Sequence, residues 1–188
     1  MKFCLRCIMP DTRPDLSIDA AGVCAACRSV EIKRKITDWV ARNDEWQKLV
    51  AANTVHPRGD YDCIAAVSGG KDSHYIVWQC LKAGMRPLCV SFEPSCMTPL
   101  GERNLSNLQR FADLIQVRKN RVVYNKLRLA ALRTIGDAEW PNHVGIFTAV
   151  TREATLRRIP LIVWGESPQA EYAPPNALSR ESNSLDRA

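Results

Sequence analysis

Residues 59–172 alternate short apolar runs with segments of helical periodicity. The apolar runs predict four strands, at residues 61–67, 87–92, 121–124 and 159–164. The segments beside them predict helices at residues 73–83, 102–115, 126–135 and 145–158. Continuous apolar strands that alternate with helices are typical of a parallel sheet covered by helices on both faces. The pattern therefore predicts an α/β fold for this part of the chain.

The chain before residue 59 has a different pattern. Apolar residues between positions 30 and 50 recur at steps of three, four and seven, which predicts one amphipathic helix. These residues are Ile32, Ile36, Trp39, Val40, Trp46 and Leu49. We expect the two tryptophans to pack in a core against the α/β region rather than to form a stacking platform. Pro57 and Gly59 predict a short linker at residues 53–60.

Four regions follow from these patterns. Residues 1–28 are rich in cysteine and in turn-forming residues, and residues 29–58 hold the predicted helix and linker. The α/β domain follows at residues 59–172. Residues 173–188 offer almost no apolar surface to bury, so we expect a disordered tail there.

The composition is that of a soluble globular protein, with 46% hydrophobic and 24% charged residues among 188. No apolar run approaches the roughly 18 residues of a membrane span, and the N-terminus lacks the apolar region of a signal peptide. We therefore expect a cytoplasmic protein with no membrane partner and with reduced cysteines. The net charge of +6 suits a nucleic acid and a small anionic substrate equally well.

Two Cys-x-x-Cys pairs lie near the N-terminus, Cys4 with Cys7 and Cys24 with Cys27. Each pair can bring two sulfurs onto one metal ion, and two pairs complete a tetrahedral site. The pattern predicts a structural Zn²⁺ site, whose binding energy would order a segment too short to build its own core. A redox-active dithiol is the alternative, but that motif belongs beside a βαβ unit.

A short polar stretch joins the first predicted strand to the first predicted helix, and it reads Ser68-Gly69-Gly70-Lys71-Asp72-Ser73. Such a turn gathers free backbone N–H groups and the positive end of a helix dipole at one point, which suits a phosphate. The glycines permit positive φ, and the serines and the lysine add donors. The carboxylate can hold Mg²⁺ or cap the helix. An ordinary strand–helix turn is the alternative interpretation.

This stretch resembles the PP-loop of the ATP pyrophosphatases, Ser-Gly-Gly-X-Asp-Ser, which it matches without a gap at residues 68–73. The resemblance implies the superfamily's Rossmann-like fold, of the adenine nucleotide alpha hydrolase type. It also implies that ATP and Mg²⁺ bind at Ser68, Gly69, Gly70, Lys71, Asp72 and Ser73. Lys71 and Asp72 would then take part in catalysis, in which a substrate carbonyl oxygen is adenylated and pyrophosphate is released.

The chain from about Cys4 to Tyr172 resembles the N-acetyl sugar amidotransferases of bacterial surface-polysaccharide synthesis, including that of lipopolysaccharide. The segments that carry the resemblance are 4–12, 22–24, 61–63, 164–166 and 171–172, together with the single residues Cys27, Thr98, Gly101, Asn104 and Leu105. The resemblance implies that ATP activates the acetamido carbonyl of an N-acetylated sugar, nucleotide-linked or acidic, for attack by ammonia from a partner glutaminase. The product would be an acetamidino group. Implied substrate contacts are Thr98, Gly101 and Asn104.

The family's C-terminal half has no counterpart in this sequence, where Ala173 takes the place of a glycine. Two other functional classes therefore stay open. The chain could be a PP-loop enzyme that modifies tRNA by thiolation or lysidine formation, which the basic charge favours slightly. It could also be a scaffold subunit that binds ATP and zinc without catalysis.

Three loops are expected at the ligand-binding edge of the parallel sheet, at residues 68–73, 93–104 and 165–172, because ligands bind beyond the carboxyl ends of the strands. Glu166 directly follows the last predicted strand. Its carboxylate is a candidate for holding Mg²⁺ or orienting the attacking amine, with helix capping as the alternative.

A few single residues are candidates on their own. His143 is a possible general base, with a helix cap or a packing residue as the alternative, and His74 is expected to pack along the first helix. Cys96 lies in the second loop and is a candidate functional thiol. The remaining cysteines lie on apolar segments, where free cysteine is usually a small buried hydrophobe. They are Cys63, Cys80 and Cys89.

Overall fold

The computed structural model describes residues 1–12, 16–54 and 61–166, and it divides the chain into two compact units. The first unit contains Met1–Asp44 and, among the described residues after the sheet, Glu166, and the second contains Glu45–Gly165. Residues 55–60 of the predicted linker, residues 167–172 of the third loop and the predicted tail at 173–188 lie outside the described residues, and Asn53, the first residue of the predicted linker, instead ends a helix. Among the described helices, none is both long and apolar enough to cross a membrane.

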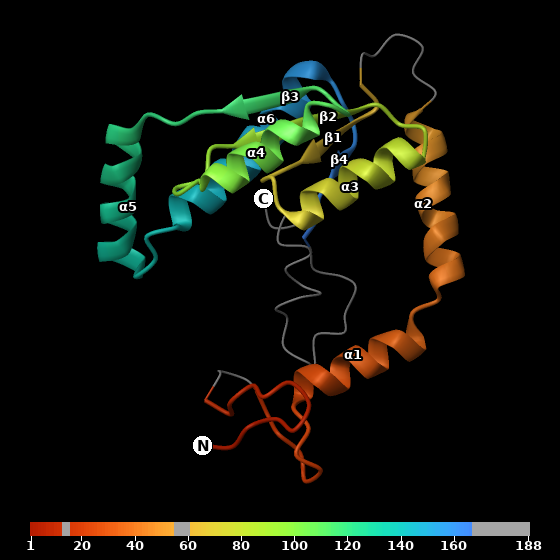
Figure 1. Ribbon diagram of the computed structural model, residues 1–188, viewed down its shortest axis with the longest axis vertical. Coiled ribbons are helices and arrows are strands. Elements are labelled where there is room, and N and C mark those ends of the chain that lie inside the picture. The colour runs from red at the N-terminus through yellow and green to blue at the C-terminus, as the bar shows by residue number, and fades with distance from the viewer. Residues whose placement is uncertain (13–15, 55–60, 167–188) are drawn as a thin grey trace. The chain divides into compact units, whose positions relative to one another are not determined.

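The second unit is built on a parallel sheet (Figure 1). Its strands are β1 (Cys63–Ala66), β2 (Pro87–Phe92), β3 (Leu114–Val117) and β4 (Ile162–Val163). They lie in the order β3-β2-β1-β4, and every neighbouring pair is parallel. In register, Ala65 of β1 stands opposite Cys89 of β2 on one side and opposite Val163 of β4 on the other. The parallel sheet predicted from the apolar runs is confirmed.

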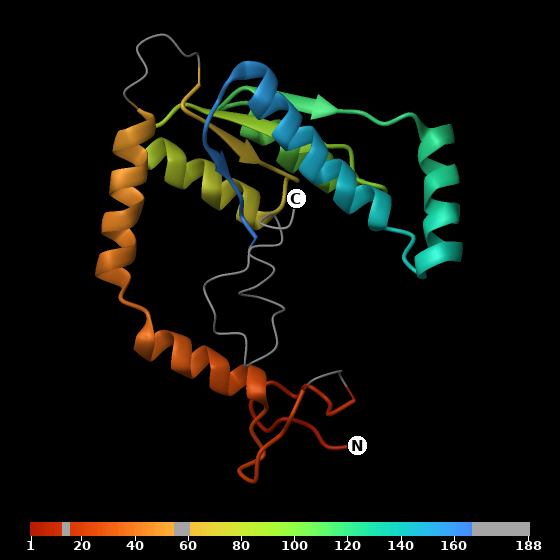
Figure 2. The same cartoon turned by 180° about the vertical axis from the view of Figure 1, so that it is seen from behind.

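Helices cover both faces of this sheet. Two helices, α3 (Lys71–Lys82) and α4 (Pro99–Leu108), lie on one face. Helix α6 (Trp140–Arg157) covers the opposite face, as the view from behind shows (Figure 2). Helix α5 (Arg121–Ile135) packs beside α6. Because successive side chains of a strand point to opposite faces, both faces of a sheet covered in this way must be apolar.

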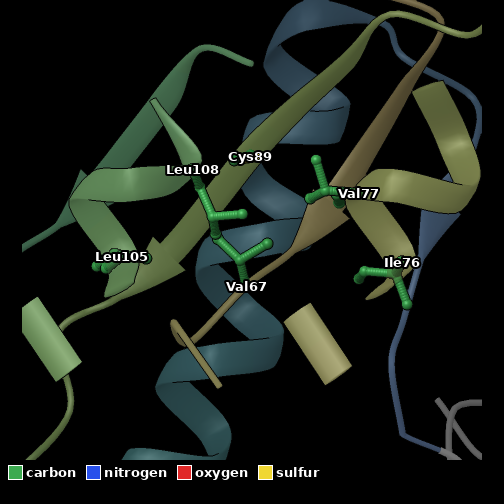
Figure 3. Packing of buried hydrophobic residues seen from close by; sticks show 7 residues of the cluster. Val67, Ile76, Val77, Cys89, Leu105 and Leu108 are labelled. Carbon is green, nitrogen blue, oxygen red and sulfur yellow. The ribbon is translucent and has the colours of Figure 1, made fainter. Parts of the chain in front are cut away.

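The two core clusters follow this alternation. On the α3 and α4 face, the side chains of Ile76, Val77, Leu105 and Leu108 pack against the sheet (Figure 3). The strand residues they meet are Ala65, Val67 and Cys89. On the other face, Val150 and Ala154 of α6 pack against the intervening strand residues. These are Ile64, Leu88 and Val90. The expectation of a sheet buried on both faces is therefore confirmed by the side-chain packing.

The predicted third strand at 121–124 is wrong, because these residues form the first turn of α5. The side chain of Asn120 accepts hydrogen bonds from the backbone N–H groups of Val122 and Val123, at 3.0 and 3.2 Å. This N-cap outweighs the strand preference of the two valines. The true third strand, β3, lies within and just beyond the helix predicted at 102–115, since α4 ends at Leu108.

The single helix predicted over residues 30–50 is also wrong. The structure has α1 (Ala25–Ile36) and α2 (Trp39–Asn53) in its place. Asp38 explains the break, because its Oδ1 accepts hydrogen bonds from the N–H groups of Val40 and Ala41, both at 3.0 Å, and so starts a new helix.

The two tryptophans of α2 have different surroundings. Trp46 packs against a third core cluster formed by Val50, Cys63, Cys80 and Met85. Trp39 is 68% exposed, so the expectation that it packs in a core is wrong. Trp39 falls in the part of α2 that groups with the first unit, whereas Trp46 belongs to the second.

Leu108→Ala should lower the free energy of unfolding of the second unit by roughly 2–5 kcal/mol, because Leu108 is 1% exposed on the face of α4 that packs against the sheet and truncation leaves a cavity. Leu100→Ala on the same helix is the matched control, because Leu100 is 58% exposed, and its effect should stay within about 0.5 kcal/mol. Urea unfolding followed by circular dichroism measures both. Equal effects would contradict the packing of α4 on the sheet.

Candidate functional site

The stretch 68–73 lies where the order of the strands reverses. From β1 the chain moves to β2 and β3 on one side of the sheet, and it returns to place β4 on the other side of β1. In open parallel sheets, ligands bind outside the carboxyl ends of the strands at such a reversal. The stretch leaves the carboxyl end of β1 and enters α3 at Lys71. The topology therefore places it at the expected ligand-binding edge.

Ser73 stabilises the conformation of this loop from its buried side. Its side chain is 6% exposed, and its Oγ accepts a hydrogen bond from the backbone N–H of Ser68 at 2.8 Å. The two serine hydroxyls also lie within hydrogen-bonding distance, with Oγ atoms 3.3 Å apart. Ser68 itself is exposed. The buried hydroxyl thus maintains the shape of the loop, while the exposed hydroxyl is available to a ligand.

The two glycines have different structural requirements. Gly69 has a φ of +86°, and a Cβ there would lie 3.1 Å from the carbonyl oxygen of Gly101 and 3.2 Å from Leu105 Cβ. Gly70 is the N-cap of α3 with ordinary extended backbone, and a Cβ there would meet only Ser68 Oγ, at 3.6 Å. No side chain caps α3. The first turn of this helix thus keeps its N–H groups and its dipole available to an anion.

Lys71 and Asp72 lie in the first turn of α3. Lys71 Nζ is 2.7 Å from Asp72 Oδ2, and the two side chains are 88% and 53% exposed. An exposed pair of this kind contributes little to stability, so a ligand can separate it at low cost. The ammonium group suits a phosphate and the carboxylate suits Mg²⁺. His74 packs along the helix as expected, with Nδ1 2.9 Å from the carbonyl oxygen of Gly70.

The loop after β4 comes close to Asp72. A Cβ on Gly165 would lie 3.3 Å from Asp72 Cβ, so the chain leaving β4 passes directly beside α3. Glu166, the predicted catalytic carboxylate, is the next residue, and its side chain is exposed. It is the last residue of the described part of the chain.

The predicted substrate residues lie at the start of α4. Thr98 is the N-cap, and its Oγ1 accepts a hydrogen bond from the N–H of Gly101 at 3.1 Å. Gly101 approaches Gly69, so the beginnings of α3 and α4 lie together. Asn104 is exposed on α4. Thr98 has a clear structural role here, which the sequence interpretation had not assigned to it.

Two further candidates lie outside both residues 68–73 and helix α4. Cys96 is exposed in the loop before α4. His143 is exposed in the first turns of α6, and its backbone N–H donates to the carbonyl oxygen of Glu139. His143 therefore lies within the helix and does not act as its cap.

A hydrogen-bonded network at the carboxyl edge was missed by the sequence interpretation. Ser95 Oγ donates to Glu139 Oε2 at 2.9 Å and lies 2.8 Å from the hydroxyl of Tyr124. The other carboxylate oxygen of Glu139 pairs with Arg128 at 2.9 Å. Above the Tyr124 ring lies Lys119 Nζ, 3.7 Å from the centroid. The network ties the loop after β2 to α5 and α6. The one signal in the sequence that could have indicated part of this network is Asn120, because as an N-cap it assigns Tyr124 to a helix rather than to a strand.

The four cysteines of the first unit form a cluster in which their Sγ atoms all lie within 4.8 Å of one another. Cys4 and Cys27 sulfurs are 4.0 Å apart, and those of Cys7 and Cys24 are 3.6 Å apart. A tetrahedral metal with bonds of about 2.3 Å requires sulfurs roughly 3.8 Å apart. The cluster is therefore arranged to hold a metal ion.

Backbone groups and neighbouring thiols set the charges in this cluster. The N–H groups of Cys7 and Cys24 lower the pKa of the Cys4 thiol to about 6. The pKa of Cys27 is raised to about 12, because its thiol makes hydrogen bonds with the side chains of Cys7 and Cys24. Four sulfurs at this distance repel one another as thiolates, so full ionisation of the cluster requires a cation between them.

Residues outside the cysteines brace the second pair. Asp19 Oδ1 accepts a hydrogen bond from the N–H of Val23 at 2.9 Å, and Asp19 Oδ2 pairs with Arg28 at 2.7 Å. The pKa of Asp19 is lowered mainly by the N–H of Val23 and to a smaller extent by the guanidinium of Arg28. Gly22 has a φ of +75°, and a Cβ there would collide with the side chain of Leu5. These contacts hold the turn before Cys24 against the first pair.

The remaining buried cysteines are structural. Cys63, Cys80 and Cys89 are each 0% exposed in the core of the second unit. A hydrogen bond with the Cys80 side chain and burial both raise the pKa of Cys63, and burial raises that of Cys89 to about 12. They are small buried hydrophobes, as the sequence predicts.

The class that the structure defines is an α/β protein with a parallel four-stranded sheet and a separate cysteine cluster able to bind a metal. The chain matches no protein-family model and no curated protein. Its family resemblance therefore remains a hypothesis that rests on its own residues.

Gly69→Ala should destabilise the second unit by about 1–2 kcal/mol from the left-handed backbone alone. The added methyl group should also push α4 away, because it would lie 3.1 Å from the Gly101 oxygen. Gly70→Ala is the matched control, since its backbone suits alanine, and it should cost no more than about 1 kcal/mol. Urea unfolding of the two variants tests this difference. Indistinguishable midpoints would rule out the close contact between the loop and α4.

Proposed function

We propose that this chain is an ATP-dependent amidotransferase of the PP-loop type, which activates the acetamido carbonyl of an N-acetylated sugar. One observation carries the proposal. The Ser-Gly-Gly-Lys-Asp-Ser stretch leaves β1 at the reversal of strand order and opens α3 without a side-chain cap. A phosphate is the ligand that best satisfies free N–H groups and a helix dipole at such a position.

In this proposal the triphosphate of ATP lies against the first turn of α3. Ser68 and the backbone around Gly70 donate to phosphate oxygens, and Lys71 leaves Asp72 to balance their charge. Asp72 would hold Mg²⁺, for which a carboxylate is a suitable ligand. Ser73, buried beneath the loop, supports this geometry without meeting the solvent. The ion pair between Lys71 and Asp72 would thus be exchanged for two contacts with Mg-ATP.

The proposed chemistry has two steps. The acetamido oxygen of the sugar attacks the α-phosphorus of ATP, and the bond to the leaving pyrophosphate breaks. Ammonia then attacks the activated carbon, AMP leaves with the oxygen, and loss of a proton from nitrogen gives the acetamidino group. Lys71 would balance charge that develops on the phosphates, and Glu166 would orient the attacking amine.

The substrate and the partner rest on the family resemblance. Thr98, Gly101 and Asn104 would line the sugar side of the site, and their proximity to the loop through the Gly69–Gly101 contact supports this assignment. A glutaminase subunit in the cytoplasm would supply the ammonia. The dispersed positive charge suits an acidic or nucleotide-linked sugar.

For the cysteine cluster we propose a structural Zn²⁺ ion held by Cys4, Cys7, Cys24 and Cys27. Four thiolates complete the tetrahedral coordination that zinc prefers and leave no position for a substrate. Little else holds the first unit together, since its buried described residues are Cys4, Cys24 and Ala25. Binding of the metal would therefore supply most of the free energy that orders this segment.

Protein purified without chelator should contain one equivalent of zinc, measured by elemental analysis. Cys24→Ser should lose the metal and reduce solubility, because Cys24 is a fully buried member of the cluster. Cys96→Ser is the matched control, since Cys96 is exposed and belongs to the second unit, and it should keep the full equivalent. The absence of stoichiometric zinc from the unaltered protein would sink this proposal.

Pyrophosphate release by the full chain tests the enzymatic proposal. With Mg-ATP, release should require both ammonium and an acetamido sugar. Asp72→Asn should reduce the rate by about 100-fold or more, because it removes the charge proposed to hold Mg²⁺ in the transition state. Asp44→Asn, an exposed carboxylate on α2, is the control and should leave the rate unchanged. Circular dichroism checks that each variant is folded.

The same assay separates the alternative functions. Release that depends on bulk tRNA and falls steeply with salt would replace the sugar with RNA as substrate, because phosphate contacts release counterions. Binding of ATP with no release under any condition would support the scaffold interpretation. Equal ATP affinity and turnover in the Asp72→Asn variant would show that the loop is not the nucleotide site.

A further inference from the structure

Helix α5 carries an exposed seam of the kind that packs against another helix. Val122, Asn125, Leu129 and Leu132 are spaced by three, four and three residues, which is the a and d spacing of a heptad. The three apolar members are 66%, 48% and 51% exposed. A helix surface with this spacing normally lies against a partner helix. In α5 these apolar side chains instead face solvent.

The charged residues of α5 flank this seam. Arg121, Lys126, Arg128 and Arg133 each directly precede or follow a seam residue, so all four occupy the positions named e and g in a heptad. These are the positions that form salt bridges across a pair of helices and select the partner. The helix contains no acidic residue. Both edges of the seam are therefore positively charged.

The other side of α5 is already used. Tyr124 and Ala131, the buried residues of the helix, occupy its c positions, away from the seam. They lie on the side that packs toward α6, where Arg128 also pairs with Glu139 at 2.9 Å. Figures 1 and 2 show α5 beside the N-terminal end of α6, at the edge of the second unit. Packing within this unit thus leaves the seam uncovered.

Part of the basic charge on the seam is uncompensated. Arg128 is paired with Glu139, and Arg121 lies 3.8 Å from Glu93 while staying 85% exposed. Lys126 and Arg133 make no ion pair within the described residues. Both of these residues occupy e positions, so an occupant of the seam must supply negative charge along that edge, while the exposed Arg121 offers a further contact on the other edge.

We propose that α5 is a docking site for an acidic amphipathic helix of a partner protein. Apolar residues of that helix would cover Val122, Leu129 and Leu132, and carboxylates at its own e and g positions would pair with the basic edges. Asn125 would fix the register, since one polar residue in a seam favours the alignment in which it is paired. This proposal does not depend on the nucleotide loop.

Charge excludes a second copy of this chain as the occupant, because two α5 helices would bring basic edges against each other in either direction. A lipid surface also fits poorly. An interfacial helix gathers its apolar side chains on one broad face, whereas α5 also exposes Val123 and Leu127 outside the seam, and the seam itself is interrupted by Asn125 and flanked by basic residues. The pattern matches a helix–helix contact.

A labelled acidic peptide of about three heptads, with valine at a, leucine at d and glutamate at e and g, tests the proposal by fluorescence anisotropy. It should bind the full chain, and a lysine counterpart should not. Leu129→Asn should abolish binding. Leu127→Asn is the matched control, since Leu127 is 49% exposed on the same helix but outside the seam, and it should retain binding.

Charge reversal provides the second arm. Lys126→Glu with Arg133→Glu should weaken binding of the acidic peptide by roughly tenfold or more and permit binding of the lysine peptide. Lys48→Glu with Arg152→Glu makes the same change in net charge on other helices and should have little effect. Circular dichroism verifies that every variant is folded.

Three results would overturn the proposal. One is no binding of the acidic peptide at high concentration. Another is a dimer of the protein itself that Leu129→Asn dissociates. The third is binding to phosphatidylglycerol vesicles that Leu129→Asn abolishes, with no binding of the peptide.

Discussion

The second unit depends on one close contact, between the backbone of Gly69 and the first turns of α4. A side chain at Gly69 would press against α4, because even a methyl group would lie 3.1 Å from the Gly101 oxygen, which is tighter than most contacts of a Cβ atom. Two helices that follow different strands are thereby brought together at their N-terminal ends. Their dipoles point the same way at the edge of the sheet, and the loop between β1 and α3 lies in the combined field. The tight contact thus creates the electrostatic property on which the proposed function rests.

The buried hydroxyl of Ser73 fixes the conformation of the same loop. Because it bonds the N–H of Ser68, the loop is shaped before any ligand arrives. A ligand therefore does not have to order the loop, and the entropy cost of binding is reduced. The exposed groups of the loop, by contrast, are held only by a weak surface ion pair. Residues 68–73 thus combine a backbone that is fixed by a buried hydrogen bond with exposed side chains that a ligand can rearrange.

Much of the fold could be predicted because buried strands and helix ends leave strong local signals. The apolar run of β2 was located to the residue, and Gly84, with a φ of +79°, ends α3 where the sequence placed a helix C-terminus. Two caps were overlooked, and each led to an error. Asn120 starts α5 in a segment rich in β-branched residues, and Asp38 divides a continuous apolar stripe. In each case one polar side chain starts a helix at a position where the hydrophobic pattern had indicated a different secondary structure.

The site was predicted less completely than the fold. Spacing along the chain identified the four cysteines, because a pair of knuckles is a local feature. The network of Ser95, Tyr124 and Glu139 joins residues up to 44 positions apart, and nothing in the order of the residues signals it. The burial of the Ser73 side chain could not be predicted either, because the sequence does not distinguish the two serines of the loop until the backbone conformation is known.

The distribution of the cysteines has a practical consequence. Three thiols are buried in the core of the second unit, and four belong to the cluster of the first unit. With a metal on that cluster, Cys96 is the remaining thiol, and it is exposed in the loop just before α4. A fluorophore or spin label attached there would occupy one defined position near the candidate site. The native chain thus carries its own attachment point for a spectroscopic reporter, without any cysteine having to be introduced or removed.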